Sequence, residues 1–405
     1  MDRNYKNFIE AFTRIYKDGF VPDQFYKWSA ISLVAAVLER KVWIPWNNGN
    51  IYPNMYVFLV AKPGVGKSTA MDRATKLLNK MVEGHGSLVR ILPNKVTEPK
   101  LLDILNEQEY FMYNNKQFPH TSAYYVASEA SACFHDVYGG FVQTLTALYD
   151  GNDIKKATVS RKQEVHVVNP CLNIVAGCTF DFLGKLLTTE GIMGGFASRI
   201  TYVIQDEMME RTSTWLGKDV KKANEDEVYK LMNDLHKIHT MVGGFGADQE
   251  FADAWNTWFP EFDKKLQTTK NEKLQALMVR KSAAMRKLPM ILSAAESSDM
   301  MLRKRHWDEA IALMDNVESK IPFMIREGQA SNTRTQTGVN SMILKLLKAS
   351  NRSNMSEDML VAAATSSGHS GILVRQTLLD MCKDGSMVAR KGAGIQLIGN
   401  PDEII

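Results

Sequence analysis

The stretch Tyr56-Val57-Phe58-Leu59-Val60-Ala61-Lys62-Pro63-Gly64-Val65-Gly66-Lys67-Ser68-Thr69 joins an apolar run to a short loop rich in small residues. The loop fits a phosphate-binding pattern, with Ala61 standing where Gly is more usual. In such a loop backbone N–H groups curl around the phosphates, a lysine reaches the β and γ oxygens, and the next hydroxyl ligates Mg²⁺. Lys67 and Ser68 would take these two side-chain roles.

The flanks of the loop agree with this interpretation. Residues 70–81 contain neither Pro nor Gly and place apolar residues at helical spacing, so the loop lies between a buried strand and a helix whose N-terminus attracts anions. The alternative is a chance Gly-Lys-Ser turn. We therefore predict that ATP or another nucleoside triphosphate binds here with Mg²⁺, at Ala61, Lys62, Pro63, Gly64, Val65, Gly66, Lys67, Ser68 and Thr69.

Composition limits the classes of protein to consider. Of the 405 residues, 45% are hydrophobic and 23% charged, which is typical of a soluble globular protein with two or three domains. A net charge of +4 is mild, so any affinity for nucleic acid must come from local patches. The four cysteines lack CxxC spacing, and neither a signal peptide nor a membrane-length apolar segment is found. This predicts a cytoplasmic protein with reduced thiols and no membrane contact.

Strand and helix patterns alternate from about residue 52 to residue 205, which favours an α/β fold with a parallel sheet and crossover helices. The expected strands are Met55–Val60, Leu88–Leu92, Ala123–Ala127, Leu172–Ala176 and Arg199–Ile204. The expected domains are an N-terminal helical extension (1–50), a P-loop ATPase core (51–215), a helical lid (216–327), a polar linker (328–337) and a C-terminal domain (338–405).

The C-terminal domain has the pattern of a winged helix. Its helices and its two-stranded wing are expected at Val339–Ala349, Glu357–Ala364, Ile372–Lys383 and around Lys391–Gly394. Arg375 on the third helix, with Arg390 and Lys391 in the wing, would contact DNA. Winged helices also bind proteins, and the sequence leaves both roles open.

A carboxylate follows the strand pattern at residues 124–127. In P-loop ATPases with an extra strand between the loop strand and this one, a Glu at this point is the general base for water, and Glu129 is the candidate here. Ser128 occupies the preceding position, often an Asp that holds Mg²⁺, and would hold a metal-bound water. The alternative is that Glu129 only caps the following helix.

Two further candidates flank later strands. Thr179 ends the pattern that starts at Leu172, where a sensor residue would touch the γ-phosphate or the attacking water; the alternative is an ordinary helix cap. Arg199 precedes the last core strand at the expected sheet edge. There it would reach a neighbouring subunit's nucleotide as a trans-acting arginine finger. The alternative is a surface Arg at a strand start.

Residues 155–168 alternate polar and apolar side chains around a basic centre, which predicts a β-hairpin with Arg161 and Lys162 near its tip. Lys155 and Lys156 lie in its first arm. Such a hairpin would project into the channel of a ring and contact the backbone of single-stranded DNA without reading its sequence. The alternative is a solvated hairpin tip.

The helical region offers two weaker candidates. Arg280 would lie over a phosphate as a lid residue, or on a solvated helix face. His236 and His239 have an i, i+3 spacing compatible with a metal ion, but no Cys or acidic residue with matching spacing stands nearby in the sequence, which favours a structural role.

Several segments together resemble a family of phage and prophage replication ATPases that look like replicative helicases and are often fused to primases. The matching segments are Pro22-Asp23-Gln24-Phe25, Tyr52-Pro53-Asn54-Met55-Tyr56, Leu148-Tyr149-Asp150-Gly151, Asn169-Pro170-Cys171-Leu172 and Gly195-Phe196-Ala197-Ser198-Arg199. The resemblance covers about residues 20–320. A helical lid followed by a winged helix is also similar to ring helicases of the minichromosome-maintenance type.

This resemblance implies a RecA/AAA+-like core. It also implies that the P-loop, carboxylate, sensor, finger, lid and hairpin residues have the roles given above. Ala61, Ser128 and the lack of a primase-like zinc motif depart from the pattern.

We therefore expect an ATP-driven hexameric DNA helicase of phage-type replication, cytoplasmic in the host if phage-encoded. It would carry single-stranded DNA in a central channel and have a primase or another replication protein as partner. Two alternatives stay open: a replication initiator or helicase loader, and a non-replicative P-loop ATPase of a defence or packaging system.

Overall fold

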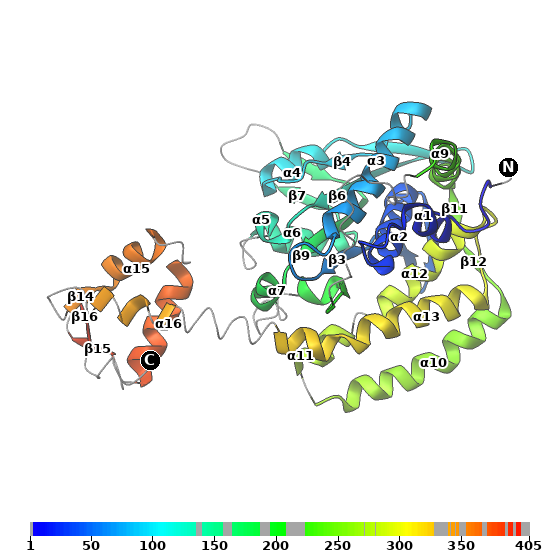
Figure 1. Ribbon diagram of the computed structural model, residues 1–405. Coiled ribbons are helices and arrows are strands. Elements are labelled where there is room, and N and C mark those ends of the chain that lie inside the picture. The colour runs from blue at the N-terminus through cyan, green and yellow to red at the C-terminus, as the bar shows by residue number, and fades with distance from the viewer. Residues whose placement is uncertain are drawn as a thin grey trace. The chain divides into compact units, whose positions relative to one another are not determined.

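The computed structural model describes residues 3–134, 140–156, 164–186, 195–207, 223–270, 272–279, 281–327, 339–340, 342–344, 346–347, 354–366, 371–384, 388–391 and 394–397. The chain divides into two compact units, Met1–Ile325 and Arg326–Ile405 (Figure 1). The division falls just before the predicted linker.

A mostly parallel six-stranded sheet forms the centre of the larger unit, which confirms the predicted α/β class. Its strands are β3 (Tyr56–Val60), β4 (Ile91–Leu92), β5 (Glu109–Tyr113), β6 (Lys116–Ala127), β9 (Pro170–Cys178) and β10 (Ile200–Ile204). The order is β10-β3-β9-β6-β4, all parallel, with β5 antiparallel on β6. All five predicted strands are present, and β9 lies between β3 and β6 as the extra strand.

Every residue of β3 is buried, which shows that both faces of the sheet are covered at this strand. Val57 and Leu59 point into one hydrophobic cluster, whereas Tyr56, Phe58 and Val60 point into another. A strand with two buried faces has a continuous apolar sequence, as here, rather than an alternating one. The first cluster includes α1 (Phe8–Tyr16), α2 (Asp23–Leu38), α3 (Lys67–His85), α9 (Glu225–His239), α12 (Lys281–Glu296) and α13 (Lys304–Ser319). The second includes α4 (Glu98–Leu105), α5 (Ala130–Cys133), α6 (Gly140–Tyr149) and α7 (Phe180–Leu186).

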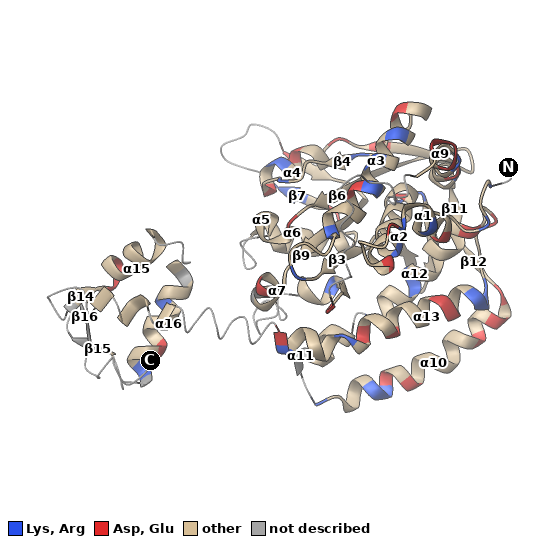
Figure 2. Ribbon diagram, viewed as in Figure 1, with Lys and Arg blue, Asp and Glu red and all other residues tan. Residues whose placement is uncertain are grey.

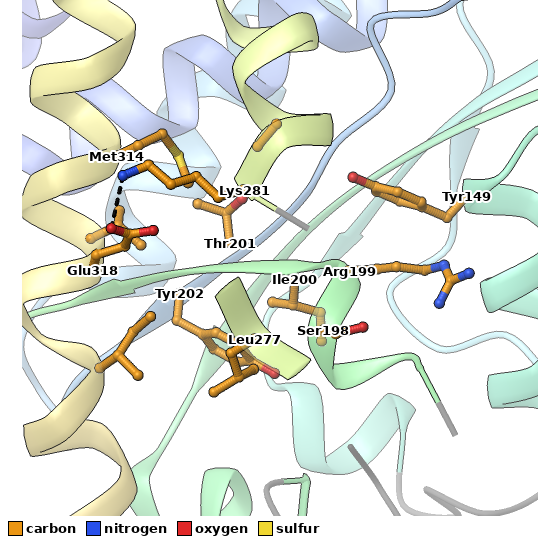
Figure 3. A pocket seen from close by; sticks show the side chains of 13 residues that line it. Tyr149, Ser198, Arg199, Ile200, Thr201, Tyr202, Leu277, Lys281, Met314 and Glu318 are labelled. Carbon is orange, nitrogen blue, oxygen red and sulfur yellow. Dashed lines mark hydrogen bonds and ion pairs between the residues drawn. The ribbon is translucent and has the colours of Figure 1, made fainter. Parts of the chain in front are cut away.

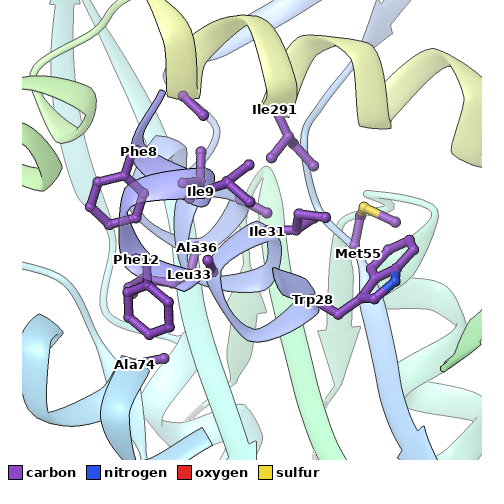
Figure 4. Packing of buried hydrophobic residues seen from close by; sticks show 14 of the residues in the cluster. Phe8, Ile9, Phe12, Trp28, Ile31, Leu33, Ala36, Met55, Ala74 and Ile291 are labelled. Carbon is purple, nitrogen blue, oxygen red and sulfur yellow. The ribbon is translucent and has the colours of Figure 1, made fainter. Parts of the chain in front are cut away.

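Helix α2 is the central helix of the first layer, with 13 of its 16 residues buried. Figure 4 shows part of this cluster, in which Trp28 and Ile31 of α2 lie together with Phe8 of α1 and Ile291 of α12. A helix that is apolar all round belongs in a core. The N-terminal helices are thus part of the same compact unit as the sheet, and the boundaries expected at residues 50 and 215 both fall inside that unit.

Residues 223–327 are mostly helical, as predicted. Besides α9, α12 and α13 they form α10 (Gln249–Thr268), α11 (Glu272–Met278) and the two-residue strands β11 (Gly243–Gly244), β12 (Gly246–Ala247) and β13 (Met301–Leu302). Strand β11 pairs with β1 (Val42–Trp46), which also pairs with β2 (Gly49–Ile51). Helices α10 and α13 each carry both acidic and basic residues, so neither helix has the single sign of charge expected of a nucleic-acid surface (Figure 2).

The predicted hairpin before β9 is present at its base. Strand β7 (Ile154–Lys156) pairs antiparallel with β8 (Val165–Val167), and Ile154 lies opposite Val167. Arg161 and Lys162, the expected tip residues, lie outside the described residues.

The smaller unit contains β14 (Asn354–Ser356), α15 (Glu357–Ser366), α16 (Gly371–Asp384), β15 (Val388–Lys391) and β16 (Gly394–Leu397). The three strands form one antiparallel sheet in the order β14-β16-β15. Two of the three predicted helices and the terminal hairpin are therefore present. The first predicted helix, Val339–Ala349, lies only partly within the described residues, and those described are helical. Strand β14 is one that the sequence pattern did not show.

Among the described helices, none has both the length and the apolar character needed to cross a bilayer.

Gly177 in β9 is required by a close approach of two backbones. A Cβ atom at this position would lie 2.5 Å from the carbonyl oxygen of Ser128. We expect Gly177→Ala to lower the free energy of unfolding by about 1–3 kcal/mol, because the two strand ends must separate. Urea denaturation measures this change.

The matched control is Gly49→Ala, where a Cβ atom meets nothing within 4 Å. Its effect should stay within about 0.5 kcal/mol. Equal effects of the two substitutions would contradict the close approach.

Candidate nucleotide-binding site

The predicted phosphate-binding loop connects β3 to α3, and its two glycines are explained by the geometry. Gly64 and Gly66 have φ values of 82° and 85°, a left-handed conformation that side chains disfavour. At Gly66 a Cβ atom would also lie 2.5 Å from Cγ2 of Val21. The segment before α2 thus packs directly on the loop.

The loop leads into the N-terminus of a 19-residue helix, with Gly66 as the N-cap of α3. A helix N-terminus carries partial positive charge and first-turn N–H groups without intrahelical acceptors, which together suit a phosphate. Ala61 and Val65 are buried and anchor the loop, whereas Lys62, Pro63, Gly64 and Ser68 are exposed.

Lys67 folds back over the loop. Its Nζ donates hydrogen bonds to the carbonyl oxygens of Ala61 at 2.7 Å and Lys62 at 2.9 Å. Burial lowers the pKa of the ammonium group, whereas Cys178 and the Glu129 carboxylate act in the opposite direction. The ammonium therefore lies where it would meet the phosphates of a nucleotide.

Glu129 and Ser128 are both exposed just past β6. Glu129 occupies the N-cap position of α5, but its side chain makes no capping hydrogen bond; its Oε1 accepts one from Ser131 Oγ at 2.6 Å. The capping alternative thus receives no support. The N–H of Ser128 donates to Oδ1 of Asn94 at 2.7 Å, so Asn94, just after β4, holds the backbone that carries the carboxylate.

The sequence patterns did not predict this role of Asn94, because a single Asn after a two-residue strand carries no signal of its own.

Thr179 lies beside the loop at the end of β9. The N–H of Ala61 donates to the carbonyl oxygen of Cys178 at 3.2 Å, which sets the loop next to this strand end. The Thr179 hydroxyl accepts a long hydrogen bond of 3.4 Å from the N–H of Phe182 in α7. Thr179 therefore caps the helix, as the alternative predicted, and its position also suits a contact to a ligand in the loop.

Strand register brings these candidates together. Val60 pairs with Cys178, and Ala127 pairs with Ala176, so β3, β9 and β6 end at the same edge of the sheet. Lys67, Thr179 and Glu129 follow those three ends. Residues from the carboxyl ends of parallel strands commonly form the ligand site of an α/β protein.

Arg199 lies at the opposite edge, where β10 begins, and its guanidinium is buried within its own chain. The residue is 8% exposed. Nε donates to Asp150 Oδ1 at 3.2 Å, Nη2 pairs with Oδ2 of the same carboxylate, and Nη1 donates to the carbonyl of Gly195 at 2.7 Å. This differs from the exposed guanidinium expected of a trans-acting finger.

A small cavity lies next to Arg199. It has a volume of about 40 Å³, and Tyr149 and Ser198 are among its lining residues (Figure 3). That volume suits water molecules rather than a nucleotide.

The Arg199–Asp150 pair joins residues 148–151 to residues 195–199, two of the segments on which the expected family resemblance rests. At Gly195, where φ is 80°, a Cβ atom would lie 2.6 Å from Nη1 of Arg199. The glycine, the arginine and the aspartate therefore form one joint between α6 and β10, in which the guanidinium is buried and the Asp150 side chain is 33% exposed.

Helix α12, which was expected to form part of a lid, does not cover the loop. Arg280 lies outside the described residues. Lys281, the first residue of α12, pairs with Glu318 (Figure 3) and with Asp315. Nζ of Lys287 donates to Oδ1 of Asn54, just before β3, at 2.9 Å. Helix α12 thus packs at the edge where the strands begin.

Lys320, at the end of α13, lies at the edge of the sheet where the strands end, which is also the edge of the predicted phosphate-binding loop. Its Nζ pairs with both carboxylate oxygens of Asp206, two residues past β10, at 2.8 Å and 3.0 Å.

The DNA-binding candidates differ in their surroundings. Lys155 is exposed, whereas Lys156 pairs with Glu98 and contacts Thr144 Oγ1 at 3.4 Å. Arg375 pairs with two carboxylates on α15, Glu357 at 2.8 Å and Asp358 at 2.7 Å. Arg390 and Lys391 lie in β15. Lys156 and Arg375 would have to exchange these partners to bind phosphate.

The two histidines of α9 have structural partners. The His236 ring stacks on His85 with centroids 4.0 Å apart, and His239 accepts contacts from Lys41.

No protein-family model and no curated protein matches the chain.

We expect Asp150→Ala to lower the free energy of unfolding by about 2–3 kcal/mol, because it leaves the buried Arg199 guanidinium without its carboxylate. Urea denaturation measures the loss. The control is Arg14→Ala, which breaks an exposed pair with Glu227 and should cost less than about 1 kcal/mol. Wild-type stability of Asp150→Ala would show that the joint is dispensable.

Proposed function

We propose that this chain is a P-loop ATPase with a RecA/AAA+-like core that binds ATP and Mg²⁺ at the carboxyl edge of its sheet. The observation that carries the proposal is the convergence of Lys67, Thr179 and Glu129 on one edge, with β9 between the loop strand and the carboxylate strand. This strand order supports Glu129 as the general base that orients water.

The residues at the edge fit the cofactor. Gly64 and Gly66 allow the left-handed backbone conformations that the loop requires, and the helix N-terminus supplies donors for phosphate oxygens. Ser68 and Ser128 are exposed hydroxyls. Mg²⁺ prefers oxygen ligands and retains several waters, so Ser68 would bind it directly and Ser128 through a water.

Each of the chain's own groups would then have a separate role. Lys67 exchanges the carbonyls of Ala61 and Lys62 for β/γ-phosphate oxygens and stabilises the charge that develops there. Glu129 accepts a hydrogen bond from the attacking water, and Asn94 keeps the backbone of Ser128 in place. Thr179 contacts the γ-phosphate or the water. Arg199 has no part in this mechanism, because it is already held inside its own subunit.

We further propose that hydrolysis drives a hexameric DNA helicase of phage-replication type. The support is the β7–β8 hairpin with its basic segment, together with a C-terminal unit whose order of helices and strands agrees with a winged helix. A loader or initiator is the second candidate, favoured by that same C-terminal unit. Sequence-selective binding of duplex DNA with slow ATP turnover would distinguish it.

The nucleotide site is tested by two substitutions. Lys67→Ala should abolish ATP turnover and weaken ATP binding, because the loop loses its cation. Glu129→Gln should bind ATP normally and lose turnover by about 10²–10⁴-fold, the range expected for a general base. Phosphate release and fluorescent-nucleotide titration measure the two effects.

Lys76→Ala, which removes an exposed lysine of the same helix α3, should leave both properties unchanged. Wild-type turnover in Glu129→Gln would remove the carboxylate from the mechanism.

The hairpin is tested by combining Arg161→Ala with Lys162→Ala. Basal ATP turnover should persist, whereas its stimulation by single-stranded DNA should fall and the salt dependence of DNA binding should weaken by about one phosphate contact per removed cation. The control removes two adjacent exposed lysines of α10, Lys264 and Lys265. Equal DNA affinity in both double variants would exclude the hairpin as the contact.

A further inference from the structure

A second cluster of functional side chains lies far along the strands from the loop, where β6 begins. Glu39, Glu109 and His120 each offer one ligand atom, and these atoms all lie within 4.8 Å of one another. Glu109 and His120 are directly opposed in the antiparallel β5–β6 pair, so their side chains share one face. Glu39 approaches from the C-terminus of α2.

Glu39 is the residue that the fold itself does not account for. It is 2% exposed, and its Oε1 has no hydrogen-bond partner among the described residues. A buried carboxylate oxygen without a donor is costly. Glu39 also has a φ of 54°, a conformation that costs a non-glycine residue energy and is concentrated at functional sites.

The surrounding groups orient the three side chains. Lys41 holds Oε2 of Glu39 at 2.8 Å, and Arg90 holds Oε1 of Glu109 at 3.1 Å. Nδ1 of His120 lies 2.8 Å from the Ser122 hydroxyl, which leaves Nε2 as the ligand atom. A metal-binding imidazole is usually fixed in this way through its other nitrogen.

We propose that Glu39, Glu109 and His120 bind one divalent transition-metal cation of the Zn²⁺ class. Two carboxylates and one imidazole are ligands that Zn²⁺ accepts, with water completing the coordination. The cation would supply the missing partner of Glu39 Oε1. Lys41, Arg90 and His239 face the same cluster, and the positive charges of Lys41 and Arg90 make binding weaker than at a site with uncompensated carboxylates.

The role of this ion is structural. It would join the end of α2, the core helix, to the β5–β6 hairpin at the edge of the sheet opposite Lys67 and Glu129. Binding would therefore raise the stability of the larger unit without entering the reaction of ATP.

The test uses the full, tag-free chain after removal of metal by chelation. Equilibrium dialysis against Zn²⁺ with elemental analysis gives the number of ions bound, and thermal unfolding gives the shift in Tm. We expect the wild type to bind one Zn²⁺ more than Glu109→Gln and to gain Tm on adding Zn²⁺, a gain that Glu109→Gln loses. Co²⁺ in place of Zn²⁺ should give visible absorption in the wild type alone.

The matched control is Glu107→Gln, two residues away, whose side chain is 82% exposed and lies 4.0 Å from the same Arg90. It should retain the wild-type stoichiometry. His120→Gln should lose the ion, and circular dichroism shows whether that buried variant is folded. Equal Zn²⁺ binding in the wild type and in Glu109→Gln, or no binding in either, overturns the proposal. Neither outcome bears on ATP turnover, so this test is separate from that of the proposed function.

Discussion

The larger unit depends on the double burial of β3 between two helical layers. Because both faces of this strand are apolar, helices must cover both sides of the sheet, and the chain must cross the sheet repeatedly. The N-terminal helix α2 supplies much of one cover. Its neighbour in sequence, Val21, reaches Gly66, so the same layer that buries the strand also packs on the predicted phosphate-binding loop. Stability and loop shape therefore have a common origin.

The parallel register then separates the molecule into two chemically different edges. At the carboxyl edge, polar residues that are exposed or half-buried follow β3, β6 and β9, which suits a ligand that enters from solvent. At the opposite edge, three charged side chains are buried and have polar partners: Arg199 with Asp150, Lys287 with Asn54, and Glu39 with Lys41. The first two contacts join separate elements, and removing the partner would leave a buried charge without compensation.

Local patterns in the sequence were reliable where the chemistry is local. The loop, its flanking strand and helix, the base of the β7–β8 hairpin, and the C-terminal helices α15 and α16 with their terminal hairpin all follow from short-range spacing. Arg199 shows the limit of such reasoning. Its place before the edge strand was predicted, but the burial of its guanidinium depends on Asp150, 49 residues away. Asn94 shows the same limit, since its contact with Ser128 exists only because β4 and β6 are neighbours.

The sequence by itself determined the α/β class and the position of the loop between β3 and α3, because a nine-residue segment between an apolar strand and a helix specifies its own conformation. Only the tertiary structure decided which distant residues share an edge. Strand order and register bring Thr179 and Glu129 beside the loop, place Arg199 at the far side, and gather Glu39, Glu109 and His120 into one cluster. These are contacts between separate segments, and their geometry arises from packing the sheet between its layers rather than from any local spacing.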